Sequence, residues 1–142
     1  SNASRGLGDV YKRQLRPGGC LAAADWNRRD PKDGAMNRTE RWVMRQLLNQ
    51  WAHPEFASIS GFRANLEASP HQRGLISTGD WTVATLPSWF DSIAEGLRRP
   101  WAVLGLGPKA VLQGLRETPT LLLMHWAFAT GLMQFGVFRL SR

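Results

Sequence analysis

The order of apolar and polar positions predicts a strand near the start of the chain. Residues 20–24 form an uninterrupted apolar run, Cys-Leu-Ala-Ala-Ala, directly after the Pro-Gly-Gly sequence of residues 17–19. A short apolar run bounded by turn residues is typical of a strand buried on both faces. The run stops at Asp25, and residues 27–34 are mostly polar. We therefore expect a short buried strand followed by a loop.

Two amphipathic helices are predicted next. Asn37 and Glu40, three residues apart, have the spacing of a capping box, so a helix is expected to begin near Asn37. Its apolar positions fall at spacings of three and four residues, at Met44, Leu47, Leu48 and Trp51. The helix must end before Pro54. Residues 60–68, with two large apolar residues four apart, predict the second helix.

The next stretch of the chain predicts one strand and two helices. Residues 75–78 predict a strand. Residues 88–97 place their apolar side chains on one helical face, and Pro100 is expected to end that helix. Residues 109–116 predict a further, short helix.

Thr118 and Pro119 predict the start of a separate long helix. Threonine is favoured just before a helix, and proline at its first position. The segment is apolar almost all round as far as Gly131, so it should be buried or lie at an interface. Residues 133–139 then show a period of two, which predicts a terminal strand. Three strands with several helices place the chain in the α+β class.

Composition excludes several classes of protein. The chain has 142 residues, of which 43% are hydrophobic and 20% are charged, so it suits one globular domain. It has one cysteine, Cys20, and its histidines are spread over positions 53, 71 and 125. This distribution argues against a disulfide scaffold and a structural zinc site. The richest apolar stretch, residues 121–128, is too short to span a bilayer.

Positive charge is concentrated in the last third of the chain. The formal net charge is +7. Residues 98–142 contain one acidic residue, Glu117. Their basic residues are Arg98, Arg99, Lys109, Arg116, Arg139 and Arg142. Nucleic-acid binding would need a denser basic stripe, so no nucleic-acid partner is expected. A basic and apolar segment favours a surface that rests near anionic lipid, with a simple solvated face as the alternative.

The first fourteen residues are expected to be a tail that is not part of the natural protein. Residues 1–3, Ser-Asn-Ala, resemble the remnant of a cleaved expression tag. Residues 9–14, Asp-Val-Tyr-Lys-Arg-Gln, match the translation of a transposon-end adaptor used in sequencing libraries, which suggests a gene assembled from environmental reads. The alternative is an ordinary basic N-terminal tail. The domain is accordingly expected to cover residues 15–142.

A run of motifs carries a family resemblance over residues 15–142. The sequence Leu-Arg-Pro-Gly-Gly-Cys-Leu-Ala-Ala-Ala-Asp at residues 15–25 resembles the turn and fifth strand of class I S-adenosylmethionine-dependent methyltransferases. Further matching segments are Asp25-Trp26, Trp51-Ala52-His53-Pro54, Gly79-Asp80-Trp81-Thr82 and Leu86-Pro87-Ser88-Trp89. Together they are similar to the C-terminal half of the tocopherol and methyl-phytyl-benzoquinol methyltransferases of plants and cyanobacteria.

The resemblance implies a truncated, Rossmann-like methyltransferase fold. Its three strands would be the fifth, sixth and seventh of a parent sheet ordered 3-2-1-4-5-7-6. The glycine-rich turn with which the family holds S-adenosylmethionine would lie upstream of residue 15. Residues 105–107, Gly-Leu-Gly, cannot replace it because no strand precedes them and the third glycine of the fingerprint is missing. The resemblance therefore implies S-adenosylmethionine for the parent enzyme, whereas this chain is expected to bind none and to be inactive.

Candidate site residues follow from the chemistry of methyl transfer, which needs a positioned acceptor, an apolar pocket and a base. His53 and Asp80 are the candidate base or hydroxyl partner, with a helix-capping or surface histidine as the alternative for His53. The candidate acceptor contacts are Asp25, Trp26, Trp51, Trp81 and Trp89. The two aspartates could instead be loop caps, and most tryptophans could be core anchors. No metal ligands are expected.

The function implied by the resemblance is methyl transfer from S-adenosylmethionine to a prenylated quinol or chromanol. The alternative is a non-catalytic lipid-interface or assembly module, docked by its tryptophans and arginines. The expected partners are a prenylated aromatic lipid and an anionic membrane surface. The expected location is cytoplasmic, peripheral to a thylakoid or plasma membrane. Because strand 20–24 would lack its fourth-strand neighbour, a homodimer or higher oligomer is expected through the exposed edge.

Overall fold

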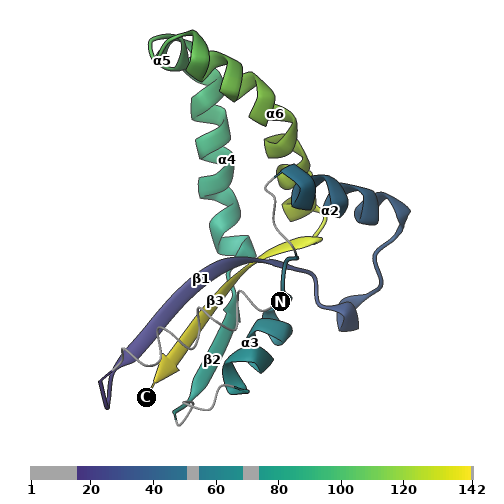
Figure 1. The fold of residues 1–142 in the computed structure, drawn as a ribbon, viewed down its shortest axis with the longest axis vertical. Coiled ribbons are helices and arrows are strands. Elements are labelled where there is room, and N and C mark those ends of the chain that lie inside the picture. Colours follow the sequence, from purple (N-terminus) through teal and green to yellow (C-terminus); the bar gives the residue numbers. More distant parts are fainter. Residues whose placement is uncertain (1–15, 51–54, 69–73, 142) are drawn as a thin grey trace.

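The computed structural model describes residues 16–50, 55–68 and 74–141. Their elements are β1 (Cys20–Arg28), the short 3-10 helix η1 (Pro31–Asp33), α2 (Arg38–Gln50), α3 (Ile59–Glu67), β2 (Ile76–Asp80), α4 (Thr82–Arg98), α5 (Pro100–Leu104), α6 (Pro108–Ala129) and β3 (Met133–Ser141). The strands form one sheet, and the helices lie on its two faces and beyond one of its ends (Figure 1). The expected α+β class is confirmed.

The three strands are ordered β1-β3-β2, with the last strand of the chain in the middle. β3 is antiparallel to both neighbours, so β1 and β2 run in the same direction. This order agrees with the 5-7-6 arrangement implied by the family resemblance. Asp25 of β1 and Asp80 of β2 both stand opposite Gly136 of β3. The carboxyl ends of β1 and β2 therefore meet at one edge of the sheet.

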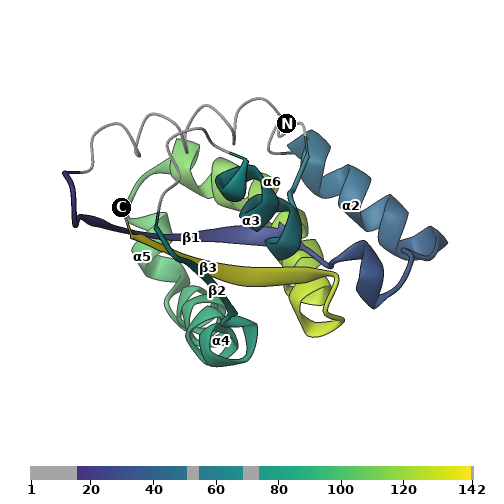
Figure 2. The same ribbon diagram turned by 90° about the horizontal axis from the view of Figure 1, so that it is seen from below.

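Helices α3 and α4 lie on opposite faces of the sheet (Figure 2). On the α3 side, the rings of Phe62 and Phe138 are stacked with their centroids 4.2 Å apart. Phe135, an odd number of residues away along β3, points to the other face, which α4 partly covers. One strand thus supplies packing surface to both layers.

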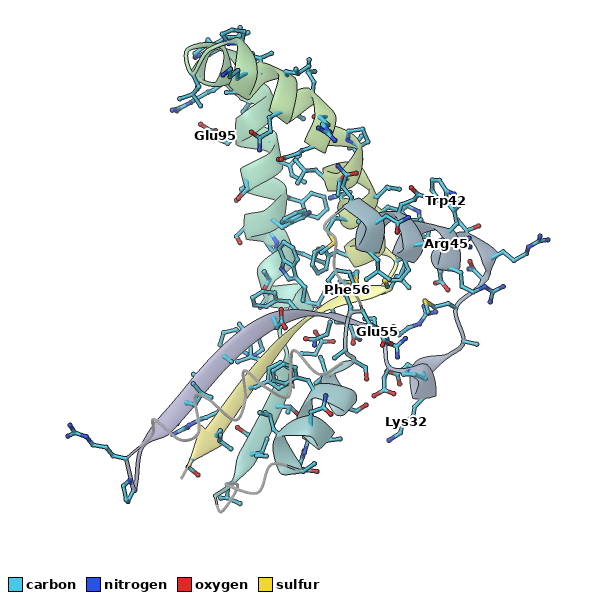
Figure 3. The ribbon with its side chains drawn as sticks, viewed as in Figure 1. Lys32, Trp42, Arg45, Glu55, Phe56 and Glu95 are labelled. Atoms are coloured by element: carbon cyan, nitrogen blue, oxygen red, sulfur yellow. The ribbon has the colours of Figure 1, made fainter. Side chains whose placement is uncertain are left out.

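The hydrophobic core lies between α2, α6 and the start of β3. Leu47 of α2, Met124 of α6, and Leu132 and Met133 have no exposed surface. They belong to one cluster that also includes Phe56, which Figure 3 shows beside this junction. Deleting a fully buried leucine side chain costs roughly 2–5 kcal/mol of unfolding free energy. This cluster therefore holds α2 and α6 to the start of β3.

The predicted capping box at the start of α2 is confirmed. The Asn37 Oδ1 atom accepts a hydrogen bond from the Glu40 N–H at 2.8 Å, and the Glu40 Oε2 atom accepts one from the Asn37 N–H at 2.9 Å. The same Glu40 carboxylate accepts bonds from both terminal nitrogens of Arg29, at 3.0 and 2.8 Å. This arrangement ties the end of β1 to the first turn of α2. The C-terminal end that was predicted for this helix, with Trp51 and Pro54, lies outside the described residues.

The prediction that the first strand stops at Asp25 is wrong. β1 continues to Arg28 because Trp26, Asn27 and Arg28 pair in register with β3. The strand is also not buried on both faces, since Cys20, Ala22, Ala24 and Asp25 are exposed. An uninterrupted alanine run carries no period from which an exposed face could have been recognised.

The predicted start of the helix over 88–97 is wrong, whereas its predicted end before Pro100 is confirmed, because the helix ends at Arg98. The helix predicted over 88–97 is α4, which begins six residues earlier, at Thr82, and includes Pro87. Pro100 begins α5 just after that helix. Pro87 is tolerated because it is exposed, and so is Val83, whose carbonyl loses its usual partner and can be hydrated instead.

The predicted break before Thr118 is also wrong. α6 is continuous from Pro108, with Pro119 in its interior. The Thr118 hydroxyl does not cap a helix; it donates a hydrogen bond back to the Gly114 carbonyl at 2.7 Å. Pro119 is exposed, as is Leu115 four residues before it, so the carbonyl that loses its partner again faces solvent. Thr118-Pro119 has the sequence typical of a helix start, but it lies in the interior of α6.

Helices α4, α5 and α6 form an arm that projects away from the sheet (Figure 1). α4 leaves the carboxyl end of β2, α5 lies at the tip, and α6 returns to β3. The large apolar residues exposed on this arm are Val83, Phe90, Leu97, Trp101, Leu104, Leu106, Leu112, Leu115, Leu121 and Leu122. The buried residues of α6 all lie in the half nearer the sheet, where they contact the core. The helix predicted from Thr118 was expected to be buried or at an interface, and this half of α6 agrees with that prediction.

Candidate functional site

A small aromatic cavity lies at the carboxyl edge of β1 and β2, where the arm joins the sheet. It is lined by Trp26, Thr82, Thr85, Leu86, Trp89, Phe128 and Phe135, and its volume is about 30 Å³. Ligands of open α/β sheets bind at this edge, outside the carboxyl ends of the strands. The lining side chains are apolar except for the hydroxyl groups of Thr82 and Thr85.

Three aromatic contacts form the wall of the cavity. Trp26 stands opposite Phe135 in the β1–β3 register, so the two side chains share one face of the sheet. The ring of Trp89 on α4 meets that of Trp26 edge to face, with centroids 6.4 Å apart and planes at 81°. It also contacts Phe128 of α6 at 5.6 Å. The wall therefore needs the sheet and both long helices of the arm.

Thr82 joins α4 to the middle strand. Its hydroxyl donates a short hydrogen bond to Asp80 Oδ1 and accepts one from the Phe135 N–H at 2.9 Å. Asp80 Oδ1 also accepts from the Thr82 N–H at 2.9 Å, so this carboxylate satisfies the first turn of α4. The Trp81 N–H completes the junction by donating to the Phe135 carbonyl at 2.8 Å. The cavity floor is thus fixed by backbone and hydroxyl bonds.

The structure separates the residues that were predicted to contact the acceptor. Trp26 and Trp89 line the cavity. Asp25 lies one residue from Trp26 along β1, so its side chain points to the opposite face, and its Oδ1 accepts a bond from the Trp26 N–H at 2.8 Å. Trp81 is 56% exposed and is outside the lining.

The two candidate bases have different outcomes. Asp80 is present at the edge, but its described contacts are those of a helix cap, and it does not line the cavity. His53, like Trp51, lies outside the described residues. His125 of α6 is described: its ring meets that of Phe90 edge to face at 4.5 Å. Its Nδ1 is buried with no hydrogen-bond partner in the described structure.

Several cavity residues were missed by sequence reasoning. Thr82, Phe128 and Phe135 come from three different elements, and strand register and helix packing alone bring them together. One of the predicted residues carries an unused polar group: Trp89 Nε1 is buried and has no hydrogen-bond partner among the residues that the structure describes. An indole N–H can only donate, so an acceptor oxygen is the atom that would satisfy it.

The described residues do not fit a cradle for S-adenosylmethionine. The Gly-Leu-Gly sequence at 105–107 lies between α5 and α6 at the tip of the arm, away from every strand. Gly107 has φ +95°, as required by the turn into α6. Within the described ranges, no cluster of three or more potential metal ligands is found. The same part of the chain contains no helix with the length and hydrophobicity needed to cross a membrane.

Comparison with known proteins gives a relative and a fold. No family model matches the chain. The chain is 50% identical over 130 residues to a 2-methyl-6-phytyl-1,4-hydroquinone methyltransferase of Synechocystis sp.; the match covers 92% of this chain and 41% of that protein. The chain therefore spans about two fifths of the length of this relative.

Solved structures of methyltransferases share the fold at low identity. A mycolic acid cyclopropane synthase has a TM-score of 0.75 at 12% identity, covering 98% of this chain and 52% of its own. Phosphoethanolamine N-methyltransferase 2 of Haemonchus contortus has 0.73 at 11%, covering 97% and 30%. A geranyl diphosphate methyltransferase bound to S-adenosylmethionine has 0.62 at 16%, covering 98% and 45%. The chain thus has a fold found in part of several methyltransferases, and its sequence is similar to about two fifths of a phytyl-hydroquinone methyltransferase.

Proposed function

We propose that this chain supplies the acceptor side of a methyltransferase that acts on a prenylated quinol. The observation that supports this proposal is the aromatic cavity at the carboxyl edge of β1 and β2. The sequence is also 50% identical, over 130 residues, to a phytyl-hydroquinone methyltransferase. In this proposal the ring of the acceptor lies against Trp26 and Trp89. The methyl donor, S-adenosylmethionine, is held by parts of the enzyme other than the described residues.

The chemistry asked of the described residues is positioning and exclusion of water. Transfer of a methyl group from a sulfonium is a displacement that gains most from holding the acceptor atom in line. The rings of Trp26, Trp89 and Phe128 provide an apolar wall, and the Trp89 N–H is available to a quinol oxygen. A hydrogen bond to that oxygen would orient the ring and stabilise its phenolate form. Asp80 acts in this scheme by fixing Thr82 and the start of α4.

The size of the cavity sets a condition on this proposal. A cavity of about 30 Å³ holds a water molecule, whereas pockets for drug-sized ligands measure roughly 300–1,000 Å³. The described cavity is therefore the floor of the acceptor site. Binding of a ring requires α4 and α6 to part, or the rings of Trp26 and Trp89 to rotate.

A binding titration tests the acceptor site without requiring methyl transfer. A hydroquinone with a short prenyl chain is added to the 142-residue protein, and tryptophan fluorescence and NMR shifts are followed. We expect saturable quenching, with shifts centred on Trp26 and Trp89, and a loss of affinity of about tenfold in Trp89→Leu. Trp42→Leu, which changes an exposed tryptophan of α2, is the matched control. Non-saturable quenching, or equal losses in both variants, would overturn the proposed site.

The donor half of the proposal has its own measurement. Calorimetric titration with S-adenosylmethionine should give no saturable heat, because the described residues provide no glycine-rich turn between a strand and a helix. Saturable binding at micromolar donor would mean that the chain holds its own methyl donor. The acceptor site would then have to be reassigned as part of a complete catalytic centre.

We also infer that the protein acts at a membrane surface, because the proposed acceptor carries a prenyl chain and is a lipid. The arm supports this inference, since it carries exposed apolar side chains next to basic ones. A non-catalytic lipid-interface module is the second candidate function, favoured by the same surface. The titration with prenylated hydroquinone separates the two, since the module has no use for the aromatic cavity.

A further inference from the structure

The tip of the arm exposes a group of large apolar side chains. Leu97 at the end of α4 is 77% exposed, Trp101 and Leu104 of α5 are 66% and 62% exposed, and Leu106 in the following loop is 76% exposed. Solvent-exposed apolar residues are common singly, but four within ten residues at one end of a projecting arm form a patch. We call these four residues the tip patch.

Positive charge surrounds the tip patch. Arg98, Arg99 and Lys109 lie within or just beyond this stretch, and Glu95 is the one carboxylate among residues 95–109. Glu95, which Figure 3 marks on α4 near the tip, is paired with Arg99 at 2.6 Å. Arg98 and Lys109 are exposed and form no ion pair within the described part of the chain. The tip therefore offers free cations beside an apolar surface.

The structure divides the basic C-terminal third into two regions. Arg139 lies in β3, within the sheet, and its Nε donates to Cys20 Sγ at 3.4 Å. It is therefore remote from the arm tip and does not add to the charge there (Figure 1). This arrangement places the lipid-facing surface expected for the segment on the arm and not on the sheet.

We propose that the tip of the arm is a membrane wedge. Trp101, Leu104 and Leu106 enter the interfacial region of a lipid layer, while Arg98 and Lys109 contact anionic headgroups. Tryptophan suits this depth because its ring is apolar and its N–H is polar, and each nearby cation adds electrostatic attraction to an anionic surface. Because the tip is positively charged, anionic lipid is the expected occupant of the patch. The patch is too short to cross a bilayer, so the contact is with the membrane surface.

This wedge would place the cavity over the membrane that holds the acceptor. The arm joins the tip patch to the cavity. Trp89 lies near the middle of α4 and Phe128 near the end of α6 that leads into β3, whereas the tip patch lies at the other ends of these two helices. This last step rests on the proposed function, whereas the wedge itself does not.

Co-sedimentation of the 142-residue protein with vesicles tests the wedge directly. Vesicles of phosphatidylcholine alone are compared with vesicles containing phosphatidylglycerol at 30%. We expect binding to the anionic vesicles and a decrease at high salt, since free cations contribute about fivefold in affinity each. Equal binding to both vesicle types would overturn the proposal, and so would no binding to either by folded protein.

Matched variants locate the contact. Trp101→Ser combined with Leu106→Ser should lower partitioning at least about tenfold. Trp42→Ser, on α2 and away from the tip of the arm, should not change it (Figure 3). Arg98→Glu with Lys109→Glu should remove the anionic preference, whereas Lys32→Glu with Arg45→Glu, at exposed positions on η1 and α2, should lower it much less.

A second copy of the chain is the competing occupant of the tip patch. If the protein is a dimer whose dissociation follows the Trp101→Ser and Leu106→Ser changes in light scattering, the patch is a dimer contact and the wedge is wrong. Failure of the hydroquinone titration together with vesicle binding would reject the acceptor site and leave the wedge in place. The reverse result would reject the wedge alone.

Discussion

The side-chain amide of Asn27 occupies the space into which a Cβ atom on Gly136 would project. A Cβ built on Gly136 would lie 2.2 Å from Asn27 Oδ1 and 3.0 Å from Phe138 Cζ. Asn27 is completely buried, and its Nδ2 donates to the Ala57 carbonyl at 3.2 Å. The middle strand therefore lacks a side chain at this position so that β1 can be tied to the segment leading into α3.

Substituting Gly136→Ala should destabilise the protein. The added methyl group would force Asn27 out of its hydrogen bond or push β1 and β3 apart, at a cost of roughly 1–3 kcal/mol in unfolding free energy. Urea unfolding followed by circular dichroism measures this change. Gly96→Ala is the matched control, because nothing lies within 4 Å of a Cβ there and alanine favours helix α4. A Gly136→Ala protein as stable as the parent would contradict the observed packing.

The ion pair between Arg29 and Glu40 should make stability depend on acid pH. The hydrogen bonds from Arg29, and then the one from the Asn37 N–H, hold the pKa of Glu40 below its ordinary value of 4.5. A carboxyl whose pKa is lower in the folded state stabilises the fold above its unfolded pKa, and this contribution is lost as the pH falls through the folded pKa. We therefore expect part of the stability to disappear below about pH 4.5.

The Glu40→Gln variant isolates this contribution. The amide oxygen can still accept from the Asn37 N–H, but the charge opposite Arg29 is gone. We expect a loss of roughly 1–3 kcal/mol at neutral pH, moderated because the Arg29 side chain is 18% exposed, and a flatter stability curve in acid. Glu67→Gln breaks the surface pair with Arg63 and should cost less than about 0.5 kcal/mol. Equal losses in the two variants would show that the buried pair has no special role.

Local signals in the sequence predicted local structure well. The capping box of Asn37 and Glu40 located the start of α2, because both hydrogen bonds join residues three apart. Pro119 misled because proline fits both the first turn of a helix and an exposed interior position. Which of the two occurs depends on whether the carbonyl four residues earlier faces solvent, and the sequence does not contain that information.

The candidate site was only half accessible to sequence reasoning. Trp26 and Trp89 were predicted because each lies in a motif of the resembled family. Phe135 and Phe128 carry no local mark, since the first reaches the cavity through strand register and the second through the packing of α6. Asp80 was predicted as a possible base, but its capping bonds to Thr82 depend on where α4 begins, which was placed six residues too late.

Removing the Thr82 hydroxyl should weaken both the fold and the acceptor site. Thr82→Val keeps the shape but leaves the partly buried Phe135 N–H and the Asp80 carboxylate without this partner, which costs roughly 1–3 kcal/mol. Affinity for the prenylated hydroquinone should fall as well, because Phe135 lines the cavity. Thr82→Ser retains the hydroxyl and should preserve both properties. If valine and serine behave alike in thermal unfolding, the hydroxyl does not hold this junction.

The outer edge of β1 predicts self-association of this chain. Among the described residues, β1 pairs with β3 on one side, and its other side carries an isolated bridge between Arg28 and Ser58 at the carboxyl end, with no further strand beside residues 20–24. An unblunted strand edge is a template for pairing with another chain, and the exposed alanines of β1 place no charge there to oppose it. We therefore expect a homodimer or larger assembly at micromolar concentration in size-exclusion chromatography with light scattering.

Charge on that strand should dissociate the assembly. Ala22→Lys with Ala24→Lys places two cations on exposed positions of β1, where they would face each other across a paired edge. We expect the dimer constant to weaken by about tenfold or more, with the circular dichroism of the folded chain retained. The same two lysine changes at exposed Ser88 and Ser92 of α4 control for net charge. A folded parent protein that is monomeric at every concentration, or dissociation by both pairs alike, would rule out assembly through β1.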